Sequence, residues 1–315
     1  MKKTFNLNRL WAVAIVLFSF AFASCEKDDA PAVNLPSLDE LISKDTSLSL
    51  FNYAIKRTHF ETYTKGGGPF TIYAPVNEAM KSFGLSSEAA INAYDSVTLN
   101  IFISNHFQST ARTFFEIPQG PNAPITMNGG ATVYGSRYKN PDIAYINGKA
   151  LDMGQEASNG YLFKYQGVLL PSPGNVTTNL QLIPEFSLFS QAIAKTNSTA
   201  TFNTNPSTVF VLSNATMQAN GYDSVRIANL TGAELAAFTN QMKYHVLSSR
   251  VYSVDFVNNG TYPTRYSSSA KVTTIKTGNG YQVKGNGNAS PVNVVAGNLT
   301  TSTGIIHVID NFLKI

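Results

Sequence analysis

Cysteine is almost missing from this sequence, which has one such residue, Cys25, in 315. Without a second thiol the chain can form no intramolecular disulfide. The part expected to fold also has no cysteine to serve as a nucleophile or metal ligand. Histidine is scarce too, at four residues, and three of them occupy the repeated positions described below. A metal cluster would therefore have too few ligands, and we predict no metal and no other cofactor.

Charge is the second scarcity. Only 13% of the residues are charged and 43% are hydrophobic, which is typical of a globular chain and not of a disordered one. The formal net charge of +4 includes Lys2, Lys3 and Arg9, which lie in a segment expected to be removed, so the rest of the chain carries about +1. A chain so close to neutral lacks the positive charge that attracts nucleic acid, so we do not predict nucleic-acid binding. The length predicts two domains, each large enough for its own core.

The apolar run near the beginning of the chain is too short to span a bilayer. Leu10–Phe22 falls below the roughly 18–20 residues that a transmembrane helix needs. Because a basic start precedes it and small residues follow it, residues 1–24 are predicted to be a secretion signal. Phe22-Ala23-Ser24-Cys25 resembles a bacterial lipobox, with Phe in place of the usual Leu. The resemblance implies cleavage before Cys25 and lipid attachment there, which would hold the protein to a membrane. The alternative is a plain secreted protein with an incidental cysteine.

Residues 25–36 are predicted to be a short tether, because they are polar and contain prolines at 31 and 36. Within them, Glu26-Lys27-Asp28-Asp29 resembles the export tag of surface lipoproteins in one large group of Gram-negative bacteria. We therefore expect a lipid-anchored outer-membrane protein that faces the cell exterior.

The remaining sequence contains a tandem repeat. Its first block shows five identities in seven positions, more than shared amphipathicity explains, and the spacing between copies stays nearly constant over three blocks. The paired blocks are Ser49–Ile55 with Ser187–Ile193, Phe70–Met80 with Ser207–Met217, and Leu99–His106 with Phe238–His245. In the middle block a β-branched and aromatic strand runs into Asn77 or Asn214, each placed to cap the next helix or to tie the strand end to it.

The later part of each copy is predicted to be strand and turn. Ile125–Tyr134 breaks at Asn128-Gly129-Gly130, and Lys271–Lys284 breaks at Gly278-Asn279-Gly280, both of which are hairpin signals. Each copy closes on an apolar strand after a glycine, near Gly160 and at Gly304. Helices followed by antiparallel strands predict an α+β domain built twice, over residues 37–174 and 175–315.

Three features together resemble fasciclin-type domains. These are a strand running into Ala74-Pro75-Val76-Asn77, a Tyr244-His245 dipeptide ending a helix, and the closing strand Gly304–Asp310. The resemblance covers nearly the whole chain after the tether, and it implies an adhesion-type role. The two copies keep different parts of the pattern, since the first has Asn105-His106 in place of Tyr-His.

The sharpest candidates for chemistry are His245, His307 and Asp310. Three interpretations are open: buried, hydrogen-bonded imidazoles that join helix to strand, a catalytic group, or metal ligation. Asp310 could orient His307 or cap a neighbouring backbone. The first copy has Phe163 where the second has His307, so chemistry that needs this histidine could operate in one domain at most. We favour structural roles for all the family-motif positions: Asn77, His106, Asn214, Tyr244, His245, His307 and Asp310.

No enzyme signature appears elsewhere in the sequence. It has no Gly-x-Ser-x-Gly, no His-Glu-x-x-His and no phosphate-binding loop ending in Lys-Ser/Thr. We therefore predict a non-enzymatic protein without catalytic residues.

Two Asp-Ser-Val segments remain, at Asp95–Val97 and Asp223–Val225. They resemble an acceptor for bacterial O-glycans, which makes Ser96 and Ser224 candidate modification sites. The alternative is that the aspartates cap helices or turns.

The predicted function is adhesion, or interaction with matrix proteins or polysaccharide, by a lipid-anchored surface protein. The alternative is an accessory lipoprotein of an outer-membrane glycan or nutrient uptake complex. Exposed aromatic residues would matter to the alternative, although tyrosines in hairpins more often pack across strands. The candidates for this are Tyr134, Tyr138, Tyr145, Tyr262, Tyr266 and Tyr281.

Overall fold

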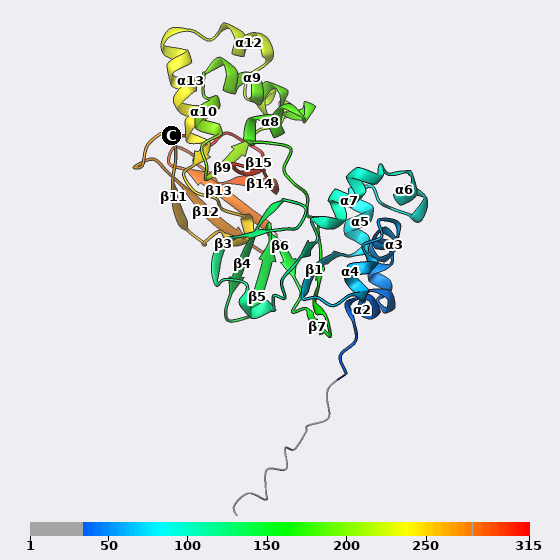
Figure 1. Ribbon diagram of the computed structural model, residues 1–315. Helices are drawn as coiled ribbons and strands as arrows, with labels where there is room; N and C mark the ends of the chain where they lie inside the picture. Colours follow the sequence, from blue (N-terminus) through cyan, green and yellow to red (C-terminus); the bar gives the residue numbers. More distant parts are fainter. Residues whose placement is uncertain (1–33, 279) are drawn as a thin grey trace, which may run out of the picture. The chain divides into compact units, whose positions relative to one another are not determined.

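The structure is a computed structural model that describes residues 34–278 and 280–315 (Figure 1). The predicted signal at 1–24, Cys25 and the tether as far as residue 33 lie outside the described residues. Pro36–Ile315 form one compact unit. Within the described ranges, no helix has both the length and the hydropathy needed to cross a membrane.

The first domain begins with helices and continues with strands. Its helices are α2 (Leu38–Lys44), α3 (Ser49–Arg57), α4 (Glu61–Lys65), α5 (Asn77–Phe83), α6 (Glu88–Ala93) and α7 (Ser96–Ser104), with 3₁₀ turns η1 (Thr46–Leu48) and η2 (Phe114–Glu116). Its strands are β1 (Phe70–Pro75), β2 (Phe107–Gln108), β3 (Gly120–Thr126), β4 (Thr132–Tyr138), β5 (Ile143–Ile146), β6 (Lys149–Leu151), β7 (Gln155–Ala157) and β8 (Gly160–Tyr165).

The second domain repeats this order. Its helices are α8 (Val176–Gln181), α9 (Ser187–Lys195), α10 (Thr199–Phe202), α11 (Asn214–Ala219), α12 (Ser224–Asn229) and α13 (Gly232–Tyr244), with 3₁₀ turns η3 (Pro184–Phe186) and η4 (Ser253–Asp255). Its strands are β9 (Ser207–Val211), β10 (Val246–Leu247), β11 (Gly260–Pro263), β12 (Lys271–Thr277), β13 (Gly280–Gly285), β14 (Val292–Thr300) and β15 (Gly304–Ile309).

The two sheets share one topology. The first has the order β2-β1-β8-β6-β5-β4-β3, with β7 also paired to β8, and the second has β10-β9-β15-β14-β13-β12-β11. Both predicted hairpins are present, as β3–β4 and β12–β13. The α+β class with two tandem domains is confirmed. One detail differs from the prediction, because the closing strand of each domain runs parallel to the first strand, β8 along β1 and β15 along β9.

Each closing strand begins at a glycine that touches the first strand. Gly160 pairs with Phe70 and Gly304 pairs with Ser207. A Cβ atom at either glycine would collide with the backbone of its partner, and Gly160 also has a φ of +153°. The glycine is therefore required for the close approach that starts the parallel pairing.

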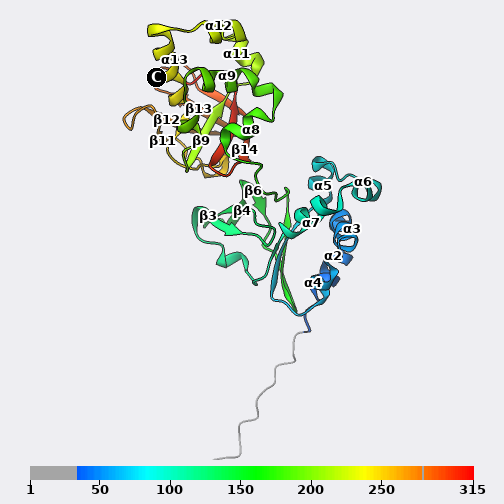
Figure 2. The same ribbon diagram turned by 45° about the horizontal axis from the view of Figure 1, so that its top comes forward.

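The cores follow from the helical periodicity of the sequence. In α3 and α9 the apolar residues fall on one face, and Phe51, Ile55, Phe189 and Ile193 are buried. Figures 1 and 2 show α2–α7 gathered beside β1 and apart from the strands β3–β5. The first domain accordingly has one apolar cluster under its helices and another within its strands, whereas the second domain has a single continuous cluster.

The motif asparagines do not cap their own helices. Asn77 is the first residue of α5, and its side chain reaches back to α3, where Oδ1 accepts from Leu50 N at 3.0 Å and Nδ2 donates to Thr46 O at 2.9 Å. Asn214 makes the equivalent bonds, accepting from Leu188 N at 2.9 Å and donating to Pro184 O at 3.0 Å. Of the two interpretations of these residues, capping of the following helix was wrong. The side chain satisfies the open N-terminus of an earlier helix, which lacks a side-chain cap of its own.

Replacement of this asparagine should lower stability in graded steps. We expect Asn214→Ala to lower the free energy of unfolding by about 1–2 kcal/mol, because the first turn of α9 loses its acceptor. Asn214→Asp keeps an acceptor for Leu188 N and loses only the donor to Pro184 O, so it should cost less. Urea denaturation of both variants tests this. Equal losses for Ala and Asp would show that the acceptor is not the stabilising part.

Candidate functional site

His106 and His245 join the end of each domain to its centre. His245 Nδ1 donates to Phe210 O at 2.8 Å, and its Nε2 accepts from Leu313 N at 3.2 Å. In the first domain His106 Nδ1 donates to Phe102 O at 2.8 Å, and its Nε2 accepts from Leu169 N at 2.9 Å. Both imidazoles are fully buried. An Nε2 that accepts a backbone hydrogen bond must be unprotonated, so each ring is neutral, and burial lowers both pKa values to about 4.

His307 is also fully buried and neutral but holds a different segment. Its Nε2 donates to Val251 O at 2.9 Å, and its Nδ1 accepts from Asn298 N at 3.4 Å. Burial lowers its pKa to about 4. Its ring stacks on Phe210 with centroids 5.8 Å apart. Since backbone groups occupy both ring nitrogens, His307 is placed to fix the loop after β10 and the irregular middle of β14.

In the first domain, two aromatic side chains occupy the positions equivalent to Phe210 and His307. The β-sheet register aligns Tyr73 with Phe163, as it aligns Phe210 with His307. Tyr73 and Phe163 stack with centroids 5.4 Å apart and an interplanar angle of 13°. The stack is therefore shared by both domains, and only the second domain adds ring nitrogens to it.

Asp310 does not orient His307. It is exposed, and its carboxylate accepts from Asn293 N at 2.9 Å and from Asn293 Nδ2 at 2.6 Å. Of the two predicted roles, orientation of the histidine was wrong, and the backbone cap on a neighbouring strand is what the structure shows. The described residues therefore contain no His–Asp pair at this strand that could act as an acid–base couple.

Tyr244 and the asparagine that replaces it make unrelated contacts. The Tyr244 hydroxyl donates to Lys271 O at 2.6 Å and accepts from Asn286 N at 2.9 Å, which attaches α13 to the β12–β13 hairpin. Asn105 instead accepts from Ala131 N at 2.9 Å and donates to Ile101 O at 2.8 Å. Each of these side chains fixes the local chain through backbone partners.

Ser96 and Ser224 are exposed first residues of helices. Asp95 and Asp223 are the N-caps before them, accepting from Thr98 N at 2.8 Å and Arg226 N at 2.7 Å. The two segments are not repeat equivalents, because α7 corresponds to α13 and α6 to α12. O-glycosylation at these serines stays a prediction.

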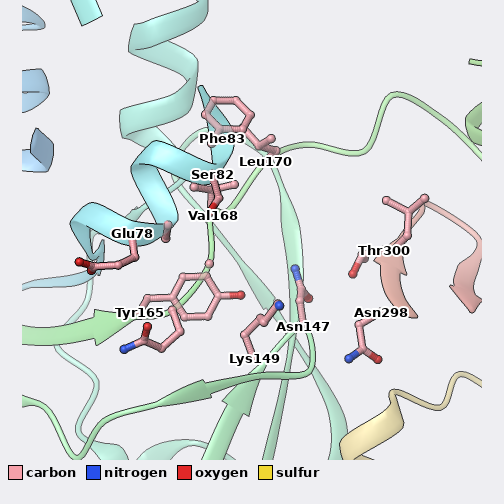
Figure 3. Close-up of a pocket in the computed structure, with 14 residues that line it drawn as sticks. Glu78, Ser82, Phe83, Asn147, Lys149, Tyr165, Val168, Leu170, Asn298 and Thr300 are labelled. Carbon is pink, nitrogen blue, oxygen red and sulfur yellow. The ribbon is translucent and has the colours of Figure 1, made fainter. Parts of the chain in front are cut away.

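A hollow of about 490 Å³ lies between the β5–β6 turn and the end of β14. Figure 3 shows Asn147, Lys149 and Tyr165 on one side of it and Asn298 and Thr300 on the other. Four of the polar side chains on its wall, those of Asn147, Tyr165, Asn298 and Thr300, are bonded to protein. The Tyr165 hydroxyl donates to Ile146 O at 2.9 Å, and Asn298 Oδ1 accepts from Ser253 N at 2.8 Å.

The β5–β6 turn, at Asn147 and Gly148, allows the two sides of this hollow to approach each other. Asn147 and Gly148 both have positive φ, at 48° and +72°, and a Cβ at Gly148 would strike the Asn298 side chain. The Tyr252 hydroxyl bridges the gap, 3.1 Å from Asn147 Oδ1 and 2.9 Å from Thr300 Oγ1. The wall of the hollow mixes polar and apolar residues and contains neither His nor Cys.

Metal binding finds no support in the part of the chain that the structure describes, where no three His, Cys, Asp or Glu residues gather.

The predicted tyrosines divide between packing and exposure. Tyr134 packs under the Arg250 guanidinium at 4.0 Å, Tyr138 donates to Asp255 Oδ1 at 2.7 Å, and Tyr266 is 38% exposed.

Sequence reasoning missed Asp255, a largely buried carboxyl in η4. Burial raises its pKa. Its segment, Ser253-Val254-Asp255, carries no motif, and its partner Tyr138 is distant in sequence. No signal in the sequence alone could have found it.

The fold and the site define a tandem α+β protein with one sheet topology used twice and buried histidines that bond to backbone. A family model described as the fasciclin domain matches residues 184–315, which is most of the second domain. The second domain therefore matches the fasciclin family, and the first domain repeats its sheet topology, so the chain has two tandem fasciclin-like domains, as predicted.

Among solved structures, the chain resembles a FAS1 domain pair from the insect cell adhesion molecule fasciclin I. The two are 17% identical with a TM-score of 0.42, and the match covers 85% of this chain and 97% of that one. No curated protein matched the sequence.

Proposed function

We propose that this protein is a non-enzymatic adhesion protein that binds surface proteins or polysaccharide outside the cell. The observation that carries the proposal is the fasciclin-domain match over residues 184–315. The structure named above comes from an insect cell adhesion molecule. The buried histidines agree with a binding role, since their ring nitrogens are occupied by backbone groups.

The place of action is also part of the proposal. The lipobox-like segment before Cys25 supports a lipid anchor, and the residues after it support display on the outer membrane facing outward. A lipid anchor would present both domains to neighbouring cells or to matrix, as an adhesion protein requires.

Cells that display the protein should be retained on a surface, and cells that cannot anchor it should not. We expect whole cells producing the wild-type chain to be retained under flow on at least one of three surfaces, namely a layer of like cells, a matrix-protein film and a neutral polysaccharide film. Cells producing Cys25→Ala should release the protein and lose retention. Equal retention with and without the protein on all three surfaces would contradict adhesion. If an outer-membrane transporter co-purifies instead, the uptake-complex alternative gains support.

A further inference from the structure

A second cavity, of about 710 Å³, lies beside η4. The second domain provides most of its wall, through the segment from Ser249 to Asn258 together with Tyr262 and Lys276. Pro121, Asn122 and Tyr138 of the first domain complete it. The wall is mainly apolar and aromatic, and a few polar groups enter it, which is the usual composition of a small-molecule site.

The key polar group in this cavity is the Asp255 carboxyl. The residue is only 8% exposed. Its Oδ1 accepts from the Tyr138 hydroxyl at 2.7 Å. Its Oδ2 is buried and has no hydrogen-bond partner among the described residues. Burial raises the pKa of Asp255, and the nearby Tyr138 and Ser136 hydroxyls only oppose that shift, since no hydrogen bond to Oδ2 forms. A buried carboxylate oxygen without a donor is costly, so a group outside the chain is expected to supply one.

Two further polar atoms in the cavity wall share this condition. Asn122 Oδ1 and Ser249 Oγ are buried without a partner in the described part of the chain. The Asn122 side chain is fixed in place, because its Nδ2 donates to Arg250 O at 2.7 Å. Carboxylate and amide oxygens can only accept, and a hydroxyl can do either. A ligand for this cavity must therefore bring several hydrogen-bond donors.

Apart from Arg250, the charges at the cavity wall are one of each sign, so together they favour neither a cationic nor an anionic ligand. The Arg250 guanidinium is directed elsewhere, toward Gly304 O at 3.2 Å and the Tyr134 ring. Lys276 Nζ donates to Val254 O at 3.3 Å and places a positive charge at the wall. That charge disfavours a cationic ligand, and the Asp255 carboxylate disfavours an anionic one. A neutral ligand meets neither penalty.

The aromatic part of the wall favours one kind of neutral donor. Tyr138, Phe256 and Tyr262 line the cavity, and Tyr138 and Tyr262 are partly exposed. A sugar ring has an apolar C–H face that can pack on an aromatic side chain, and hydroxyl groups at its edge that donate hydrogen bonds.

We propose that this cavity binds a hexose unit of a neutral oligosaccharide, with ligand hydroxyls donating to Asp255 Oδ2 and Asn122 Oδ1 and the ring packing on tyrosine. The assignment rests on the proposed binding function and names its ligand class. His307 supports the same wall from behind, through Val251 O at 2.9 Å and a ring contact with Phe256 at 5.5 Å.

Calorimetric titration of the purified full-length protein in mild detergent tests the proposal. The probes are maltohexaose, cellohexaose and mannohexaose, each a neutral hexose oligomer. At least one should bind saturably. Asp255→Asn, which removes the charge and one acceptor, should weaken that binding about tenfold or more, and Tyr262→Ala should do the same through loss of the packing surface. Asp310→Asn, at an exposed carboxyl outside the cavity, is the matched control and should bind as the wild type does.

Thermal unfolding of each variant checks that it is folded. If Asp255→Asn does not fold, Tyr262→Ala still tests the proposal. Saturable binding that both cavity variants weaken supports the proposal. Absence of binding by all three hexamers, or equal binding by wild type and both variants, would overturn it. Asp255-dependent binding of butylammonium in place of the sugars would also overturn it, because the site would then take a cation. Retention of cells on a protein film without any oligosaccharide binding would refute the cavity assignment and leave the adhesion proposal intact.

Discussion

Acidification from pH 6.5 to pH 4 is expected to destabilise the protein steeply. His106, His245 and His307 have folded pKa values lowered from 6.5 to about 4 by burial. Below pH 6.5 the unfolded chain binds protons that the folded chain cannot, so the stabilisation is complete above pH 6.5 and is lost toward pH 4. Each histidine contributes up to about 1.4 kcal/mol per pH unit, and three contribute about 4 kcal/mol per unit near pH 5.

One buried carboxyl, Asp255, and one half-buried carboxyl, Asp152, act in the opposite direction. Burial raises the pKa of Asp152 and of Asp255, so the folded chain binds their protons more readily as the pH falls. Where the histidines titrate, these two carboxyls should reduce the slope that the histidines set without changing its sign.

Urea denaturation at several pH values and fixed ionic strength measures this slope. His245→Gln removes one titrating group and should reduce the slope by about a third, within the limit of three equivalent sites. His59 has an exposed side chain, and His59→Gln is the matched control for the substitution itself. A free energy of unfolding that stays constant between pH 6.5 and pH 4.5 would contradict neutral, backbone-bonded histidines.

Truncation of the buried leucine at the end of either domain should destabilise that domain strongly. Leu313 and Leu169 are both 0% exposed, and each donates its backbone N–H to a buried histidine. Leu313→Ala or Leu169→Ala keeps this hydrogen bond but leaves a cavity, so we expect a loss of about 2–5 kcal/mol in the free energy of unfolding.

Leu182→Ala is the matched control, because Leu182 is 63% exposed. Its effect should stay within about 0.5 kcal/mol. Calorimetric unfolding of the three variants distinguishes the positions. A loss below about 1 kcal/mol at both buried leucines would mean that the segments around them relax into the gap, and that the end of each domain is not part of its core.

The repeat made much of the fold predictable from sequence. The hairpins were predicted because their signals are local, as with Asn128-Gly129-Gly130 between β3 and β4. The apolar pattern of β15 predicted a strand, but its neighbours could not be read from it. Parallel pairing of β15 with β9 depends on contacts between residues far apart in the chain, which no local pattern encodes.

The sequence predicted which residues of the candidate site are distinctive, but not what they contact. The sequence identified His245 and His307 as chemically distinctive, and comparison with Phe163 argued against a shared reaction. Their partners, Leu313 N and Val251 O, are backbone groups, which nearly every residue has. No side-chain motif in the sequence could therefore have predicted them. Asp255 and Asn122 were missed for a related reason, because their significance comes from hydrogen bonds left unmade after folding.

The position of β8 and β15 has a consequence for synthesis. Each of these strands is the last of its domain to leave the ribosome, yet each lies inside its sheet, beside β1 or β9. Until it arrives, the first strand presents an open edge to any other extended chain. A polypeptide interrupted before Gly304 would have a folded first domain and a second domain with β9 unfilled on one side. Such a product is expected to exchange strands with neighbouring molecules. Loss of the short segment from Gly304 onward should therefore cause aggregation.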